Sequence, residues 1–191
     1  MTALDSLDPK YRAILCDIWG VVHDGDRVLP GVEATLLRWK GEARTIILVT
    51  NAPRSADTVL SYLDMLGLPR AAYDAITSSG EAGIAALTDP PRPVGFLATH
   101  DDKLDLASRG VMFSPGEFAE LACTGLDEWR DSPDEYREQL ESWARSRVVM
   151  HCLNPDRIVI HCGRREACAG ALADIYEELG GRVLWYGKPH K

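Results

Sequence analysis

The chain has 191 residues, and its 21 Lys and Arg against 29 Asp and Glu give a formal net charge of −8. A chain of this length forms one large domain or two small ones and can bury a substantial core. The acidic balance argues against binding to nucleic acid or to an anionic membrane surface. No apolar run reaches the roughly 18 residues of a membrane span, and the polar N-terminus lacks the pattern of a signal peptide. We therefore expect a cytoplasmic protein.

The cysteines favour reduced thiols over a disulfide framework, because their number is odd and most fall inside apolar strand or helix patterns. They are Cys16, Cys123, Cys152, Cys162 and Cys168. Two His-Cys pairs, at 151–152 and 161–162, also raise the question of a zinc site. Each pair falls in a predicted strand, where neighbouring side chains point to opposite faces, so core packing is the favoured interpretation.

The stretch 14–25 begins with a short apolar run and continues with an acid and a glycine, Asp17 and Gly20. The run predicts a strand buried on both faces of a parallel sheet. In such sheets ligands bind beyond the carboxyl ends of the strands, so Asp17 stands where a nucleophile would act. Gly20 lets the backbone approach a ligand closely. Taken alone, the pattern is also common turn chemistry.

A second apolar run, 45–49, predicts another buried strand that ends at Thr50-Asn51. Ser55 is placed to cap the following helix, which stops at Gly67. The Thr50 hydroxyl, the Asn51 amide and backbone N–H groups near the helix start could bind an anion. Arg54 could add a bidentate phosphate contact. The alternative is a simple helix cap beside a surface arginine.

The remaining patterns predict strands alternating with helices. The Asp24-Gly25 pair predicts a short hairpin, with residues 21–29 as a flap. Ser132-Pro133-Asp134-Glu135 forms a capping box that opens a helix. The other predicted helices cover roughly 32–40, 102–108 and 168–179, and the other strands 76–78, 94–99, 121–123, 148–152, 158–162 and 183–186.

Five stretches together resemble the haloacid dehalogenase (HAD) superfamily, specifically its NagD-like class IIA phosphatases. They are Cys16-Asp17-Ile18-Trp19-Gly20-Val21, Val49-Thr50-Asn51, Asn154-Pro155-Asp156, Cys168-Ala169-Gly170 and Tyr186-Gly187-Lys188-Pro189. The resemblance implies an α/β fold: a HAD-like Rossmannoid core with a parallel sheet and an inserted α/β cap domain. Residues 1–77 would form the first part of the core, 78–180 the cap, and 181–191 the return to the core. The family's fourth motif, an acidic loop, would come after Lys191, so we expect a chain truncated before that motif, with an incomplete core sheet.

The resemblance also implies a mechanism. Asp17 would attack a phosphoryl group and form an aspartyl-phosphate. Mg²⁺ would be held by the Asp17 carboxylate and the Trp19 carbonyl oxygen, and Lys188 would offset the remaining negative charge. The expected substrate-binding residues are Gly20, Thr50, Asn51, Arg54, Asn154 and Asp156. The expected partner is a small phosphorylated molecule, with neither nucleic acid nor membrane, in a chain that could form a homo-oligomer.

One position departs from the family pattern. Family phosphatases usually carry a second Asp, a general acid and base, where this chain has Trp19. An indole N–H cannot exchange a proton at neutral pH, and losing general acid–base help lowers rates by roughly 10²–10⁴-fold. The nearest replacements in sequence are His23, Asp24 and Asp26.

The first hypothesis is therefore a Mg²⁺-dependent phosphatase that prefers aryl or acyl phosphates. The alternative is a catalytically impaired scaffold that binds a phosphorylated ligand or a protein partner. Dehalogenation is set aside, since the resemblance is to a class with a different cap.

Overall fold

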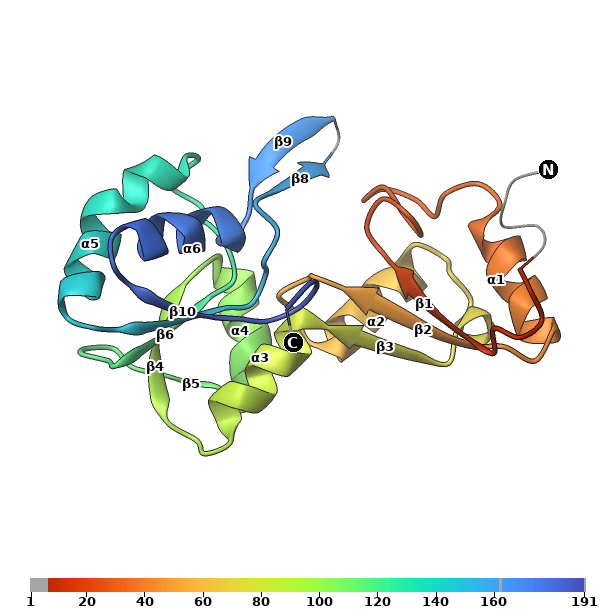
Figure 1. Ribbon diagram of the computed structural model, residues 1–191, viewed down its shortest axis with the longest axis horizontal. Coiled ribbons are helices and arrows are strands. Elements are labelled where there is room, and N and C mark those ends of the chain that lie inside the picture. The colour runs from red at the N-terminus through yellow and green to blue at the C-terminus, as the bar shows by residue number, and fades with distance from the viewer. Residues whose placement is uncertain (1–6, 162, 191) are drawn as a thin grey trace. The chain divides into compact units, whose positions relative to one another are not determined.

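The computed structural model describes residues 7–161 and 163–190 (Figure 1). It divides into two compact units. Unit 1 contains the described residues up to Thr50 together with Leu60–Thr77. Unit 2 contains Asn51–Val59 and the described residues from Ser78 onward.

Unit 1 is built on a three-stranded sheet of order β1-β2-β3, formed by β1 (Ala13–Asp17), β2 (Thr45–Thr50) and β3 (Ala75–Ser78). Strands β1 and β2 are parallel, with Asp17 opposite Val49. Helix α1 (Val32–Gly41) connects them, as the parallel arrangement requires. A 3₁₀ turn, η1 (Arg70–Ala72), precedes β3. The two predicted strand ends, at Asp17 and Thr50, thus lie on neighbouring strands.

The exposure of β1 differs from the prediction of a strand buried on both faces. Ala13, Leu15 and Asp17 are exposed, and the Leu15 side chain is 72% accessible. The reason lies in the strand order, because among the described residues β1 has β2 as a neighbour on one side only. Strand β2 occupies the central position, and there Ile46 and Leu48 are fully buried.

Unit 2 contains a five-stranded parallel sheet of order β10-β7-β6-β4-β5 (Figure 1). The strands are β4 (Pro93–Leu97), β5 (Met112–Phe113), β6 (Glu120–Cys123), β7 (Val149–Cys152) and β10 (Arg182–Trp185). The helices are α3 (Ser79–Thr88), α4 (His100–Ser108), the 3₁₀ turn η2 (Pro133–Tyr136), α5 (Arg137–Arg145) and α6 (Ala169–Glu178). Helix α2 (Ala56–Met65) begins in unit 2 and ends in unit 1.

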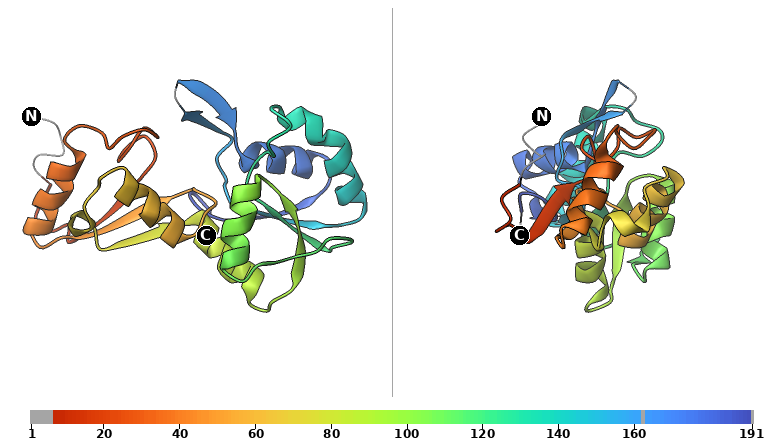
Figure 2. Two further views of the ribbon diagram at one scale, coloured as in Figure 1. Left: turned by 180° about the vertical axis from the view of Figure 1, so that it is seen from behind. Right: turned by 90° about the vertical axis from the view of Figure 1, so that its right-hand side faces the viewer.

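Both faces of this sheet are covered by helices, which explains the nearly continuous apolar strands (Figure 2). One core cluster joins Leu121 and Cys123 of β6 to Leu140 of α5 and Leu172 of α6. Ala122 of the same strand belongs to a second cluster, which includes Leu106 of α4 and Leu87 of α3. Successive residues of β6 therefore face opposite layers, and the expected α/β fold class is confirmed.

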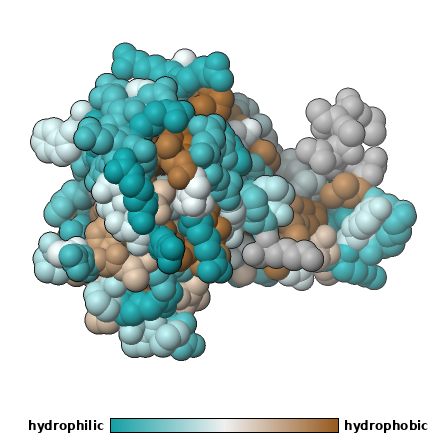
Figure 3. Space-filling model, turned by 60° about the vertical axis from the view of Figure 1, so that its left-hand side comes forward, coloured by the Kyte–Doolittle hydropathy of each residue, from teal (hydrophilic) through white to brown (hydrophobic). Residues whose placement is uncertain are grey.

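The face shown in Figure 3 is largely hydrophilic, with apolar side chains visible between polar ones. Among the described residues, no helix has both the length and the apolar character needed to cross a membrane.

Local capping signals in the sequence were reliable. The predicted capping box at Ser132 is present, and in it the Glu135 carboxylate accepts a hydrogen bond from the Ser132 backbone N–H at 2.9 Å. The turn that it opens is 3₁₀, and the α-helix follows directly. Ser55 accepts a hydrogen bond from the Thr58 N–H at 3.2 Å, as expected of a helix cap.

Three parts of the fold differ from the predictions. The strands β5 and β9 (Arg164–Ala167) were not predicted, and β8 (Ile158–His161) pairs with β9 as an antiparallel hairpin. The predicted flap hairpin has a single antiparallel bridge, His23 to Val28, rather than paired strands. Strand β10 pairs with β7 in unit 2, whereas the sequence assigned residues from 181 onward to the core.

Candidate active site

The carboxyl ends of β1 and β2 bring two predicted site residues to one edge of the unit 1 sheet. Asp17 is exposed and ends β1, and Thr50 is buried and ends β2. The Asp17 carboxylate accepts a hydrogen bond from the Ile18 N–H at 2.9 Å. This local bond orients the carboxylate without burying it, which suits an acid that must reach a ligand.

The chain turns sharply after Asp17. The Ile18 carbonyl oxygen accepts from the Val22 N–H at 2.7 Å, and the Gly20 N–H donates to the His23 carbonyl at 2.8 Å. Gly20 has a φ of +75°, a conformation that favours glycine over residues with a Cβ. The position where the family has its second Asp, Trp19, packs its ring edge-on against His23, with centroids 5.2 Å apart.

His23 is the centre of the flap. Its side chain is almost fully buried, its Nδ1 accepts from the Gly25 N–H at 3.1 Å, and its ring also contacts Tyr62, with centroids 5.4 Å apart. The Tyr62 hydroxyl donates to the Gly25 carbonyl. Burial lowers the pKa of His23, so the ring is neutral at pH 7 and carries no acidic proton. The structure therefore favours a packing role for His23 over that of a replacement general acid.

Asp24 is also poorly suited to donate a proton. Its Oδ1 accepts from the backbone N–H groups of Asp26 and Arg27 at 3.1 and 3.2 Å. These bonds, that of Asp26 first, lower the pKa of Asp24, which keeps the carboxylate ionised at neutral pH. Of the three residues proposed from the sequence as a substitute acid, His23, Asp24 and Asp26, only Asp26 thus remains a candidate.

Asn51 connects its own stretch, Val49-Thr50-Asn51, to Asp156 and to Lys188 of the Gly187-Lys188-Pro189 stretch, and Asn51, Asp156 and Lys188 all lie in unit 2. Its Nδ2 donates to Asp156 Oδ1 at 2.8 Å and to the Lys188 carbonyl at 3.0 Å, and its Oδ1 accepts from the Lys188 N–H at 2.8 Å. The side chain is buried, and its amide hydrogens and oxygen are used in these bonds. Asn51, predicted to bind substrate, therefore fixes the backbone of Lys188.

The residue before Lys188 has to be glycine. Gly187 has a φ of +94°, and a Cβ there would lie 2.7 Å from both Asn51 Oδ1 and Ser79 Cβ. Ser79 holds this contact in place, because its Oγ donates to the carbonyl oxygens of Ala52 at 3.0 Å and Leu153 at 2.5 Å. The sequence analysis missed Ser79, since nothing in its local pattern distinguishes it from other residues at a helix start.

The turn at 154–157 is held by one bond within it and by contacts of Arg157 with α6 and β10. The Asp156 N–H donates to Asn154 Oδ1 at 3.1 Å. Arg157 forms two bonds to Asp174, at 2.9 and 2.7 Å, and its guanidinium lies over the Trp185 ring. These contacts hold the turn against α6 and β10. The contact of Asn154 and Asp156 with substrate stays a prediction.

Arg54 has a partner that its sequence context did not reveal. Its Nε donates to Asp102 Oδ1 at 2.8 Å, and Asp102 is buried and also accepts from Thr124 Oγ1 at 2.9 Å. The ion pair offsets much of the charge that Arg54 would bring to an anion. A phosphate contact by Arg54 stays a prediction, and it would have to use the other side of the guanidinium.

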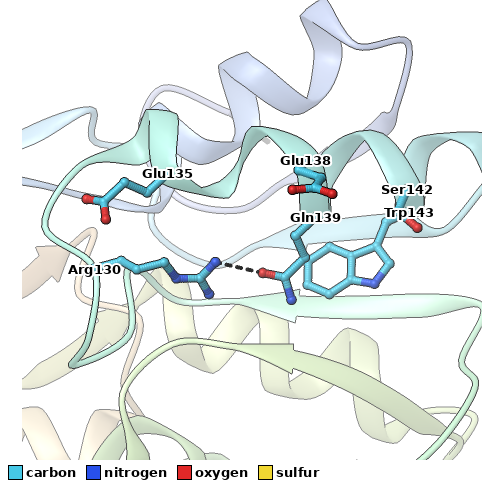
Figure 4. Close-up of a pocket in the computed structure, with 6 residues that line it drawn as sticks. All are labelled: Arg130, Glu135, Glu138, Gln139, Ser142 and Trp143. Atoms are coloured by element: carbon cyan, nitrogen blue, oxygen red, sulfur yellow. Dashed lines mark hydrogen bonds between the residues drawn. The ribbon is translucent and has the colours of Figure 1, made fainter.

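A cavity on the surface of unit 2 lies elsewhere (Figure 4). It measures about 390 Å³ and is lined by Arg130, Glu135, Glu138, Gln139, Ser142 and Trp143, none of which is a predicted site residue. Arg130 donates to Gln139 at 2.9 Å and pairs with Asp127, so the cation there already has partners.

Within residues 7–161 and 163–190, no group of three His, Cys, Asp or Glu side chains is arranged to hold a metal. The described cysteines are free thiols, and Cys162 lies outside the described residues.

Comparison with known proteins shows the family of the chain. Residues 14–112 match the family model of the haloacid dehalogenase-like hydrolases. A hydrolase of that family from Brucella suis 1330 is similar at 38% identity and a TM-score of 0.90, over 98% of this chain and 70% of its own. A possible sugar phosphatase of the HAD superfamily from Cytophaga hutchinsonii is similar at 25% identity and a TM-score of 0.74, over 99% and 71% of the two chains.

More distant structures share the fold. A 4-nitrophenylphosphatase from Thermotoga maritima has 18% identity and a TM-score of 0.71, over 94% of this chain and 69% of its own. A putative NagD protein has the same identity and a TM-score of 0.69. Comparison with curated sequences gives no significant match. On the family match and the Brucella structure, the chain belongs to the haloacid dehalogenase-like hydrolases, with the fold of the NagD-like class.

Proposed function

We propose that this hydrolase cleaves a small phosphate ester, with Asp17 as the nucleophile. The observation that carries the proposal is the position of Asp17, an exposed carboxylate at the end of β1, next to the strand that ends in Thr50. In a parallel sheet this edge is where ligands bind. The phosphatase relatives support the choice of phosphate as the group transferred.

The reaction has two steps. An Asp17 oxygen attacks phosphorus and the bond from phosphorus to the ester oxygen breaks, which leaves an aspartyl-phosphate and releases an alkoxide or phenolate that takes its proton from solvent water. A water oxygen then attacks phosphorus, the bond from phosphorus to the Asp17 oxygen breaks, and a proton of that water passes to solvent. Inorganic phosphate leaves, and the Asp17 carboxylate is restored. The Thr50 hydroxyl would donate a hydrogen bond to a phosphate oxygen, and the Lys188 ammonium would offset its negative charge.

A magnesium ion fits the chemistry of these residues. Mg²⁺ prefers oxygen ligands and is commonly bound by one or two carboxylates, substrate phosphate and several waters. Asp17 would provide the carboxylate and Trp19 its carbonyl oxygen. When bound, the ion would supply positive charge that lowers the repulsion between carboxylate and phosphate. A glycerol phosphate phosphatase from Mycobacterium tuberculosis with the same fold, at 19% identity and a TM-score of 0.61, has been solved with magnesium.

The role of Asn51 follows from its contacts. Because its amide holds both backbone polar groups of Lys188, Asn51 would position the lysine rather than touch the phosphate. In this arrangement Asn51 supports the backbone that carries the Lys188 side chain.

Replacing the nucleophile tests the proposal. Asp17→Asn keeps the size of the side chain and removes its charge, and we expect kcat for phosphate ester hydrolysis to fall by roughly 10³-fold or more. The measurement is phosphate release from a broad ester panel with Mg²⁺. Asp64→Asn, an exposed acid of unit 1 on α2, is the control and should hydrolyse like the parent. Equal release by Asp17→Asn and the parent would instead favour the scaffold that binds a phosphorylated ligand or a protein partner.

The leaving group gives a second prediction. Trp19 cannot protonate a departing alkoxide, so aryl phosphates, whose phenolates leave unprotonated, should react faster than alkyl phosphates by roughly 10²-fold or more. Steady-state kinetics on 4-nitrophenyl phosphate and glycerol phosphate provide the comparison. Trp19→Asp should narrow the ratio by raising the alkyl rate. Equal rates on the two esters with the parent would contradict the prediction.

A further inference from the structure

Four polar side chains of unit 2 form a continuous hydrogen-bonded series across its parallel sheet. They are Arg92, just before β4, Glu120 of β6, His151 of β7 and Tyr186, just after β10. This series of side chains ends at Tyr186, which lies two residues before Lys188 in the sequence. Neither the strand patterns nor the motifs in the sequence connect these four residues.

Each link is a short hydrogen bond. Tyr186 Oη lies 2.8 Å from His151 Nδ1, and His151 Nε2 lies 2.6 Å from Glu120 Oε2. The same carboxylate oxygen accepts from Arg92 at 2.6 Å. The His151 and Tyr186 rings are also stacked, with centroids 5.7 Å apart and planes 9° from parallel. Only 2% of His151 is exposed, so both ring nitrogens depend on these partners.

The donor and the acceptor of each of these hydrogen bonds can be assigned in one consistent way. The bond from Arg92 lowers the pKa of Glu120, so its carboxylate is ionised and can only accept. His151 must therefore donate from Nε2. Burial lowers the pKa of His151, which leaves the ring neutral and makes Nδ1 an acceptor. Burial also raises the pKa of Tyr186, whose hydroxyl keeps its proton and donates it to His151.

Tyr186 is held both through its side chain and through its backbone. Its N–H donates to the Cys152 carbonyl at 3.1 Å, which continues the pairing of β10 with β7 by one residue. After Tyr186 the strand ends, and the next backbone anchor is the pair of bonds between Lys188 and Asn51. Gly187 alone separates the two anchors.

We propose that Tyr186 and His151, backed by Glu120, are positioning residues that fix the Gly187-Lys188 segment. Only one part of this proposal rests on the proposed function, namely the expected effect on hydrolysis through the position of Lys188. Its structural part, the rigidity of residues 186–190, holds whether or not the chain hydrolyses phosphate esters.

Tyr186→Phe is the decisive variant, because it keeps the stacked ring and removes only the donor to His151. Amide hydrogen exchange, followed by mass spectrometry on the full chain, reports on residues 186–190 without any turnover. We expect exchange there to be faster by about fivefold, the equivalent of losing one neutral hydrogen bond. On esters that the parent hydrolyses, kcat should fall by about the same factor with KM nearly unchanged, since the lysine is misplaced rather than lost.

Tyr176→Phe is the matched control. Tyr176 is fully buried in the same unit, and its hydroxyl donates to the Val148 carbonyl at 2.6 Å, away from residues 186–190. Its loss should leave both exchange at 186–190 and kcat as in the parent. Glu120→Gln is a second variant that keeps side-chain volume and weakens the acceptor for His151, so it should raise exchange at 186–190 by a smaller factor. It carries the test if Tyr186→Phe does not fold.

Two results would overturn the proposal: parental exchange at 186–190 in both Tyr186→Phe and Glu120→Gln, or an equal increase in Tyr176→Phe. Absence of hydrolysis by the parent would count against the proposed function alone, because the exchange comparison does not use turnover.

Discussion

His23 and His151 show how burial changes what a residue can do. The sequence offered His23 as a substitute acid because it lies close to Trp19. In the structure it is buried and accepts a backbone hydrogen bond, so it organises the flap. His151 was considered as a zinc ligand, and it instead links Tyr186 to Glu120. For both, burial in the folded chain lowers the pKa and so decides the protonation state.

These histidines predict a pH dependence of stability. Burial lowers both pKa values below the ordinary 6.5, so the unfolded chain binds more protons than the native one as the pH falls below about 6.5. The free energy of unfolding should be highest above that pH and should decrease between pH 6.5 and 5. Urea unfolding at pH 7.5 and 5.5 measures the difference. His23→Asn should make it smaller, whereas the exposed control His100→Asn should not, and an unchanged difference in His23→Asn would contradict this account.

At the scale of elements, position within a sheet determines what a strand contributes to stability. Strands β1 and β2 have similar apolar sequences, and both were predicted to be buried. Central β2 buries Leu48 completely, whereas Leu15 of β1 is 72% exposed. Hydrophobicity along a strand therefore did not reveal its neighbours. The strand β5 escaped prediction because two residues carry too little periodic signal, and β9 (Arg164–Ala167) escaped because its sequence is mostly charged and exposed.

The two leucines predict very different effects of truncation. Leu48→Ala should lower the free energy of unfolding by about 2–5 kcal/mol, since it removes buried methyl groups and leaves a cavity. Leu15→Ala should change it by no more than about 0.5 kcal/mol, as expected of an exposed site. Chemical denaturation followed by circular dichroism gives both values. A loss for Leu15→Ala as large as that for Leu48→Ala would show that β1 is covered in solution.

For the whole molecule, long-range pairing decided the division into units. The sequence placed residues from 181 onward with the core, but β10 pairs with β7. It also placed 51–59 there, whereas the Ser55 N–H and hydroxyl bond Asp105 of α4 at 2.7 and 2.8 Å. The assignment of these units to a core and a cap remains a proposal from the family resemblance.

The sequence by itself determined the family, the order of most strands and helices, their caps, and the placement of Asp17 and Thr50 at strand ends. These depend on local periodicity and on short motifs, which neighbouring residues encode. Only the tertiary structure assigned Arg54 to Asp102, and Asn51 to Asp156 and Lys188, across 48, 105 and 137 residues of sequence. No local pattern specifies such partners, because they meet only when the strands and helices that carry them have packed.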